Sequence, residues 1–434
     1  MRRVAFILIS PAVLAAALLY ARHVTSSPGD PTLFWDDDVR REVQAIVEHR
    51  YVDPVDEERS RHLFQAALQG YVSRLDPFSR YVPPEDRRRQ DEETQGAFGG
   101  IGVRASSVTE GLLVTAVREG APADRAGVLP GDVIERVDGQ PVTGRDLDQT
   151  VAMLRGEPGT SVAVDLRRGG AALSLTVERA LVPSDTVPAV RTIPGDAAGT
   201  APVGYVRIEQ FADTTAHDVR DALETFRRDG VGAVVLDLRQ NLGGVVHGAV
   251  DVASLFLPEG AVVCVVRRRE GGELQRTKTF EGFTPTDVPL VLLVDEQTAS
   301  ASEILSGALQ DHGRAVLVGE RTWGKFLVQT LVETRAEKSI VRLTTARYET
   351  PRGRSGPRDE SRGPLAGLQP DVRVPLLSTA ERDALRLTFA AQLGPHWKSP
   401  PRDDRPAPDR ALDAALALVR GGPPPAVRVS VRAL

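Results

Sequence analysis

The spacing of apolar and polar residues differs between three regions of the chain, and each spacing predicts a different structure. Residues 36–49 and 56–74 carry apolar side chains three or four positions apart, which predicts two amphipathic helices. Between residues 94 and 182, short apolar runs are separated by glycine-containing turns, a pattern typical of a β-rich module. Between residues 203 and 318, apolar runs alternate with helical patterns, which predicts a mainly parallel sheet covered by helices.

These patterns predict a multidomain protein of mixed α/β and α+β class. Its 434 residues leave room for two or three domains of ordinary size. The expected parts, in chain order, are a leader segment (1–27), a helical region (32–93), the β-rich module (94–182), a βα core (183–395) and a proline-rich tail with one helix (396–434).

The leader segment predicts export. Arg2 and Arg3 precede an apolar run of 18 residues, 4–21, against about 20 needed to span a bilayer as a helix. The run is long for a signal peptide and contains Pro11, so a cleaved signal and a retained membrane anchor both remain open. Either one predicts a protein outside the cytoplasm, periplasmic or anchored with inner-membrane association.

Charge and composition exclude several classes of function. The net charge of −5 gives no reason to expect nucleic-acid binding. The single cysteine, Cys264, lies in an apolar run and is expected to be a buried strand residue. The seven histidines stand singly, without the spacing of metal ligands, so no metal and no cofactor is predicted.

Lysine is rare in this chain. The 54 basic residues include only four lysines, which are Lys278, Lys325, Lys338 and Lys398. Arginine therefore supplies the generic positive charges, while a lysine, unlike an arginine, can lose its proton in a protein. This contrast draws attention to the lysines, and to Lys325 in particular, as candidate bases.

Ser300 is a candidate nucleophile because it lies where a buried strand, 288–294, turns into a helix that begins near residue 301. Free N–H groups and the helix dipole at such a position can stabilise an oxyanion. The alternative is structural, since Ser300 and Glu303 also fit a helix capping box, and capping is the commoner role for serine here. Ser302 is a rival nucleophile.

Lys325 follows a glycine-flanked turn and enters a strand-like run. Apolar neighbours such as Trp323 and Phe326 would lower the pKa of a buried amine, and Gln329 could orient it. Taken alone, the stretch is better explained by a surface lysine on a loop.

A third element is the Gly243–Gly244 turn after the buried strand 234–238. Such a turn can offer a backbone N–H to a substrate carbonyl as half of an oxyanion hole. By itself it is no more than a strand–turn–helix connection.

Together these elements resemble the C-terminal processing (tail-specific) protease family. The matching stretches are residues 70–81, 98–103, 236–244, 298–311, 319–329 and 367–371. Ser300 and Lys325 are 25 positions apart, as the serine and lysine are in that family. The resemblance covers about residues 35–375 and favours a catalytic role for Ser300 over capping alone.

The resemblance implies a serine endopeptidase with a protease core of ClpP/crotonase-like type. It implies Ser300 as nucleophile, Lys325 as general base and Gln329 as the partner that orients the lysine. It also implies an oxyanion hole made by the backbone of Ala301 and of Gly243 or Gly244.

Residues 94–182 resemble a PDZ domain. Their implied role is to hold the C-terminal tail of a protein or peptide substrate, although a PDZ domain that only packs against the core is the alternative. The implied carboxylate-binding loop consists of Phe98, Gly99, Gly100, Ile101, Gly102 and Val103. An adaptor or a second copy of the chain is a further candidate partner.

The chain departs from the family pattern at three positions. Phe326 replaces the glycine that usually follows the lysine, Phe78 replaces a histidine, and Leu368 replaces isoleucine. Phe78 is expected to be structural and the Leu368 exchange innocuous. Phe326 could narrow the substrate site or displace Lys325. We therefore weigh two hypotheses: an endopeptidase that cleaves exported proteins, and a catalytically impaired PDZ scaffold that only binds tails.

Overall fold

The structure is a computed structural model of the chain. It describes residues 37–375 except 88–96, 146, 198, 269–271, 281–285, 336 and 357–366, and then residues 381–382, 385, 388–389, 392, 397–398 and 409–421. The chain divides into two compact units, residues 1–67 and 68–434. The apolar run 4–21 lies outside the described residues, and no helix within them is long and apolar enough to cross a membrane.

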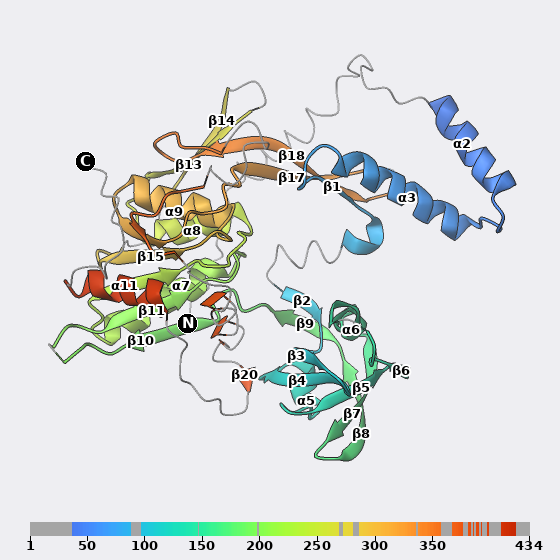
Figure 1. Cartoon of the computed structure of the whole chain (residues 1–434), viewed down its shortest axis with the longest axis horizontal. Coiled ribbons are helices and arrows are strands. Elements are labelled where there is room, and N and C mark those ends of the chain that lie inside the picture. Colours follow the sequence, from blue (N-terminus) through green and yellow to red (C-terminus); the bar gives the residue numbers. More distant parts are fainter. Residues whose placement is uncertain are drawn as a thin grey trace, which may run out of the picture. The chain divides into compact units, whose positions relative to one another are not determined.

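The two predicted N-terminal helices are confirmed as α2 (Asp37–Arg50) and α3 (Glu57–Ser73) (Figure 1). Their apolar faces, however, are less buried than the spacing suggests. In α3, Leu63 is half exposed, and Val72 is the only apolar residue of the predicted buried side that is buried. Helical periodicity therefore located the helices correctly but overestimated their burial.

A six-stranded sheet forms the centre of the predicted βα core, in the order β10-β11-β12-β15-β16-β19. All its neighbours are parallel except β10 and β11, so the predicted parallel sheet is confirmed. Its strands are β10 (Ala189–Ile193), β11 (Val203–Arg207), β12 (Ala233–Asp237), β15 (Leu290–Val294), β16 (Ala315–Gly319) and β19 (Val372–Arg373).

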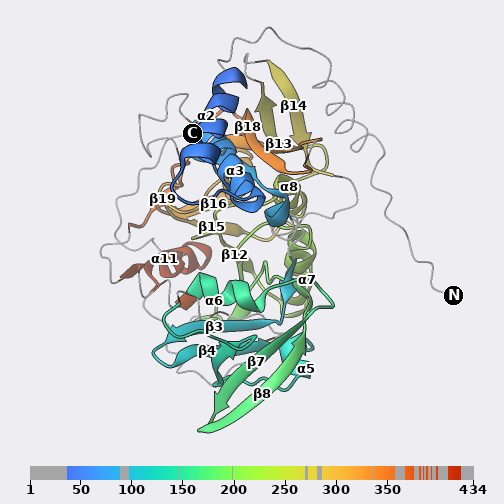
Figure 2. The ribbon, with the colours of Figure 1, turned by 90° about the vertical axis from the view of Figure 1, so that its right-hand side faces the viewer.

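Helices cover both faces of this sheet, because its strands are apolar on both sides. One face packs against α7 (Thr215–Arg228), α8 (Val246–Ser254) and α9 (Ala301–Asp311). The other face packs against α11 (Arg410–Val419), the helix predicted in the tail. Figure 2 shows α11 beside β12 and β15.

A second, antiparallel sheet contains the strand that carries Cys264. The sequence pattern assigned this strand to the parallel sheet, which is wrong, because β13 pairs antiparallel with both β14 and β18. Cys264 is nevertheless buried, as expected, and burial raises the pKa of its thiol to about 11. The strands are β1 (Arg80–Val82), β13 (Val262–Arg267), β14 (Glu273–Lys278), β17 (Leu327–Glu333) and β18 (Ile340–Glu349).

The β-rich module has its own apolar core, which contains Leu112, Ile134 and Val164. Two short helices, α5 (Pro122–Arg125) and α6 (Leu147–Leu154), accompany its strands. The strands are β2 (Ala97–Gly100), β3 (Val103–Val108), β4 (Gly111–Arg118), β5 (Val133–Val137), β6 (Gln140–Pro141), β7 (Ser161–Arg168), β8 (Ala171–Glu178) and β9 (Ala180–Pro183).

One strand of this module comes from a distant part of the sequence. β20 (Trp397–Lys398) pairs antiparallel with β4, and Lys398 Nζ forms an ion pair with Asp124 at 2.7 Å. No local pattern predicted this strand. The mixed, multidomain fold class is confirmed, while the ClpP/crotonase-like type of the core stays a prediction.

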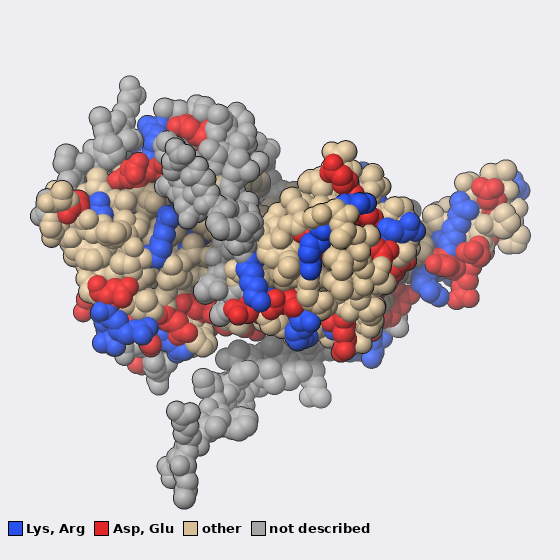
Figure 3. All heavy atoms as spheres, turned by 90° about the horizontal axis from the view of Figure 1, so that it is seen from below, with Lys and Arg blue, Asp and Glu red and all other residues tan. Residues whose placement is uncertain are grey.

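One face of the molecule carries charges of both signs (Figure 3). On the face drawn in Figure 3, basic and acidic side chains of the described residues lie interspersed among neutral ones.

Candidate functional site

The candidate site lies where two neighbouring parallel strands end. Ser300 follows β15, and the Gly243–Gly244 turn follows β12, the strand that pairs with β15. Carboxyl ends of adjacent parallel strands meet at one edge of a sheet, which is where open α/β sheets bind ligands. Lys325 lies on the segment that connects β16 to β17, just before β17 begins.

Ser300 occupies a strained turn at the start of α9. Its φ of 57° and ψ of −117° lie outside the usual regions for a residue with a side chain. Strain of this kind concentrates at functional sites, where the surrounding structure holds it in place. The rival nucleophile Ser302 is fully buried, and its Oγ donates to the carbonyl of Asn241 at 3.1 Å. Ser302 is therefore a structural residue.

A single carboxylate joins the serine turn to the lysine loop. Oε2 of Glu303 accepts the N–H of Ser300 at 3.0 Å and the N–H of Lys325 at 2.8 Å. Its Oε1 accepts the Thr322 hydroxyl at 2.6 Å and the Gly324 N–H at 2.7 Å. Burial raises the pKa of Glu303, while these four hydrogen bonds oppose the rise. The capping interaction predicted for Ser300 and Glu303 is thus part of a larger bridge.

The hydroxyl of Tyr348 makes a second bridge between the same two segments. It lies 2.8 Å from the carbonyl oxygen of Ser300 and 2.8 Å from that of Lys325. The Phe326 side chain is 2% exposed and its ring lies 5.1 Å from the Tyr348 ring, in the main core. Phe326 therefore supports the bridge, and its ring is buried in the core.

Lys325 is half-buried, and burial lowers the pKa of its amine to about 8. The positive charge of Arg342 acts in the same direction, whereas Glu303 and Asp76 act in the opposite one. The prediction that the Trp323 side chain covers the Lys325 amine is wrong, because that side chain is about half exposed.

Gln329, the expected partner of Lys325, lies on β17. Its amide Nε2 is 3.4 Å from the Thr344 hydroxyl on β18. Its role in orienting the lysine stays a prediction.

The two glycines of the candidate oxyanion turn do different things. A side chain at Gly243 would collide with Ser300, since its Cβ would lie 2.8 Å from the Ser300 Cβ and 3.0 Å from the Ala301 nitrogen. The Gly243 N–H donates to Asn241 Oδ1 at 2.8 Å. It would have to leave Asn241 to bind an oxyanion, whereas the Gly244 N–H donates to no other group among the described residues. Gly244 has a φ of 141°, and a side chain there would strike the Phe211 backbone.

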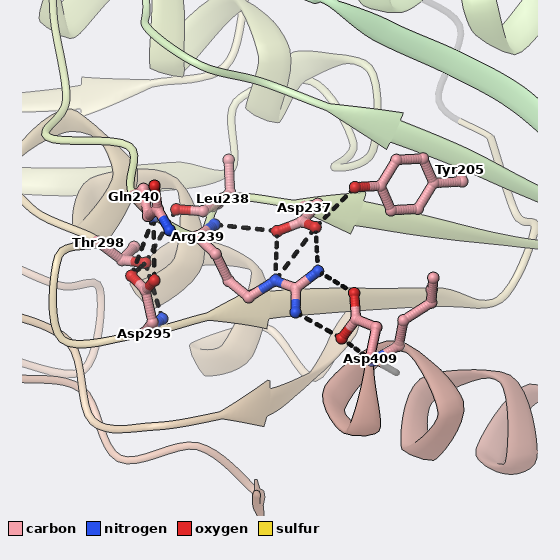
Figure 4. A network of polar contacts seen from close by, with 9 residues as sticks. Tyr205, Asp237, Leu238, Arg239, Gln240, Asp295, Thr298 and Asp409 are labelled. Carbon is pink, nitrogen blue, oxygen red and sulfur yellow. Dashed lines mark hydrogen bonds and ion pairs between the residues drawn. The ribbon is translucent and has the colours of Figure 1, made fainter. Parts of the chain in front are cut away.

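A polar network surrounds Arg239 and Gln240, which precede this turn in the chain (Figure 4). Asp295 accepts the N–H of Gln240 and the hydroxyl of Thr298, so it joins the glycine turn to the serine turn. Burial raises the pKa of Asp295 to about 6. Next to it, the buried Arg239 guanidinium binds Asp237 on β12 and Asp409 before α11.

Three residues around the candidate site were not predicted from the sequence. Glu303 and Tyr348 each bridge the Ser300 and Lys325 segments, and Asp409 of the tail binds Arg239. Only Glu303 left a signal, because it completes the capping box with Ser300. Within the described parts of the chain, no group of three or more His, Cys, Asp or Glu side chains could hold a metal ion.

The β-rich module contains a cavity of about 80 Å³ between the predicted carboxylate-binding loop and α6. Gly99 does not line it; its carbonyl accepts the Gly156 N–H at 3.2 Å. The Arg155 guanidinium covers the Phe98 ring at 5.0 Å. The lining residues are Phe98, Gly100, Ile101, Gly102, Val103, Ala105, Val151, Leu154 and Arg155.

Comparisons with known proteins agree with this architecture. Residues 202–374 match the sequence model of Peptidase family S41, and residues 113–168 match that of the PDZ domain. A carboxyl-terminal-processing protease of Synechocystis sp. is 36% identical over 329 residues, covering 74% of this chain and 74% of the relative. The chain belongs to the C-terminal processing proteases of Peptidase family S41. A carboxy-terminal-processing protease of Bartonella bacilliformis is 34% identical over 316 residues, or 71% of this chain and 70% of that protein.

Among solved structures, the photosystem II D1 C-terminal processing protease is 30% identical, with a TM-score of 0.44. The match covers 79% of this chain and 94% of that one. As a member of the S41 family the chain is a serine-type peptidase, and it contains a PDZ domain.

Proposed function

We propose that this S41 peptidase is an endopeptidase of exported proteins that uses Ser300 as nucleophile and Lys325 as general base. The observation that carries the proposal is the Glu303 bridge, because one buried carboxylate receives the backbone N–H of both residues. Such a bridge fixes two loops that are remote in sequence, as a dyad requires. Tyr348, which lies within 2.8 Å of both carbonyls, supports the same pairing.

In the proposed reaction, neutral Lys325 Nζ takes the proton of Ser300 Oγ while Oγ forms a bond to the scissile carbonyl carbon. The carbonyl electron pair moves to oxygen, and the N–H groups of Ala301 and Gly244 stabilise that oxyanion. The lysine ammonium then returns its proton to the departing amine. Water hydrolyses the acyl-enzyme through the same base. Gln329 is proposed to orient the amine.

The PDZ domain is proposed to hold the substrate tail. Its cavity of about 80 Å³ is lined mainly by apolar side chains, including Ile101 and Leu154, and suits a small aliphatic C-terminal residue. The tail would add as a strand along β3, with its carboxylate at backbone N–H groups of the loop residues that line the cavity, Gly100, Ile101 and Gly102. An apolar leader, an adaptor and membrane association remain part of the proposal.

The alternative of an inactive scaffold rested on Phe326. The ring of Phe326 is buried against Tyr348, which gives the scaffold no support from the structure. The peptidase is accordingly the only function proposed.

Product mapping tests the proposal. Purified protein from residue 28 onward is incubated with a peptide that ends in free alanine, and fragments are identified by mass spectrometry. We expect cleavage by the wild type and none by Ser300→Ala, because the variant lacks the nucleophile. The same peptide with an amidated C-terminus should be cut more slowly, since it lacks the carboxylate that the PDZ domain binds. Equal rates for wild type and Ser300→Ala would refute the mechanism.

The proposal also predicts the dependence of activity on pH. A general base works only in its deprotonated form, and burial lowers the pKa of Lys325 to about 8. We expect kcat/KM to rise about tenfold per pH unit below about pH 8 and to level off above it. Initial rates between pH 6 and 10 measure this. A flat profile through pH 8 would contradict the assignment of Lys325.

A further inference from the structure

The ring of Phe78 lies over the amine of Lys325. The distance from Nζ to the ring centroid is 4.4 Å, within the range of about 6 Å in which an ammonium is attracted to an aromatic face. From the sequence, Phe78 was expected to be only structural. The contact gives it a position at the candidate base.

The loop that carries Phe78 is held firmly. Oδ1 of Asp76 accepts the N–H of Phe78 and of Ser79, both at 2.8 Å, which closes an Asx turn. Oδ2 of Asp76 accepts the Ser79 hydroxyl at 2.6 Å. The same hydroxyl accepts the Thr344 N–H of β18 at 3.1 Å. The turn that carries the ring is thus fastened to the sheet that also carries Gln329 and Tyr348.

Three charged groups act on the amine from the elements around it. Arg342 on β18 disfavours the ammonium, while Glu303 on α9 and Asp76 on the Phe78 loop favour it. Burial disfavours it more than any of them. The Phe78 ring differs from all these groups, because it keeps water from the amine and yet attracts the ammonium through its negative face.

We propose that Phe78 is a positioning residue for Lys325, binding the ammonium form of its side chain and so setting the pH range in which the peptidase works. The inference rests on the proposed role of Lys325 as base. When the Ser300 proton passes to Nζ and Oγ bonds to the carbonyl carbon, the new ammonium faces the ring. It stays there until it protonates the departing amine as the C–N bond breaks.

The test titrates Lys325 directly. The chain has only four lysines, so a protein labelled with ¹³Cε-lysine gives few signals, and Lys325→Arg identifies the one of interest. Spectra are recorded in the Ser300→Ala background to prevent self-cleavage. In Phe78→Leu, which keeps an apolar side chain without a ring, we expect the pKa of Lys325 to fall by about half a unit to one unit. Phe78→Tyr should restore it.

Activity of the same substitutions with Ser300 intact separates the two claims. A fall in the Lys325 pKa, together with an equal shift of the pH at which kcat/KM begins to decline on the acid side, supports both the role of Phe78 and that of Lys325. A fall in pKa without a shift of the limb supports the Phe78 contact but refutes Lys325 as base. An unchanged pKa in Phe78→Leu overturns the role of Phe78 and leaves the dyad standing. Should Phe78→Leu fail to fold, the Lys325 pKa is measured in Phe78→Met, which also lacks a ring, and an unchanged pKa again overturns the role of Phe78.

Discussion

Lys325→Arg is expected to lower kcat/KM by about a thousandfold or more, without loss of fold. Arginine keeps the positive charge but cannot lose its proton in a protein, so it cannot act as the base. General bases contribute about 10² to 10⁴ in rate, and the unassisted hydroxyl of Ser300 is a poor nucleophile. Peptide cleavage followed by mass spectrometry measures the loss. Lys278→Arg is the matched control, because Lys278 is an exposed lysine on β14 and its replacement should leave the rate unchanged.

Chemical rescue makes this prediction sharper. Lys325→Cys, alkylated with bromoethylamine, carries an amine on a side chain of nearly the length of lysine. The native Cys264 is buried, and its raised thiol pKa keeps it unreactive under mild conditions, so alkylation is selective for the new cysteine. We expect inactive Lys325→Cys to regain activity after alkylation. More than a tenth of wild-type activity in Lys325→Arg would contradict the role of Lys325.

The sequence alone predicted the features that depend on short local patterns or on a family motif. The helix start at residue 301, the buried strand before it and the Gly243–Gly244 turn all follow from short patterns, and the structure has them where they were expected. The pairing of Ser300 with Lys325 came from their spacing in a family resemblance. The structure adds a contact that supports the proposed pairing: the carboxylate of Glu303, three residues after the serine, accepts the backbone N–H of both residues.

The features that the sequence could not reveal are contacts between distant segments. Phe78 reaches Lys325 from far upstream, and Asp409 reaches Arg239 across 170 positions. A local window also misjudged the aromatic cover of the lysine, because it counted Trp323, a neighbour in sequence that is exposed in space. The antiparallel pairing of β13 was missed as well, because the direction in which a strand pairs depends on its partner, and the partner β18 is distant in the sequence.

The contact between Arg239 and Asp409 connects the C-terminal tail to the edge of the sheet where the candidate site lies (Figure 4). The guanidinium donates to Asp409 Oδ1 at 2.7 Å and Oδ2 at 2.8 Å, and to Asp237 Oδ1 at 2.9 Å. Burial acts to raise the pKa of Asp409, but Arg239, the N–H of Leu412 and the charge of Arg191 together hold the pKa of that carboxyl below its usual range. Beyond the ion pair, α11 packs Leu412 and its neighbouring alanines on the sheet. The tail helix is therefore an integral part of the core.

Arg239→Met is expected to destabilise the protease core by about 3–5 kcal/mol, because it leaves Asp237 buried without its cationic partner. The Tyr205 hydroxyl, 2.8 Å away, and one backbone N–H would be its remaining hydrogen-bond donors. Urea unfolding in the Ser300→Ala background measures the change in the free energy of unfolding. Asp409→Asn is the milder control: it removes one of the two carboxylates and leaves Asp237 paired with Arg239. A loss below about 1 kcal/mol in Arg239→Met would show that the network contributes no more than an exposed ion pair.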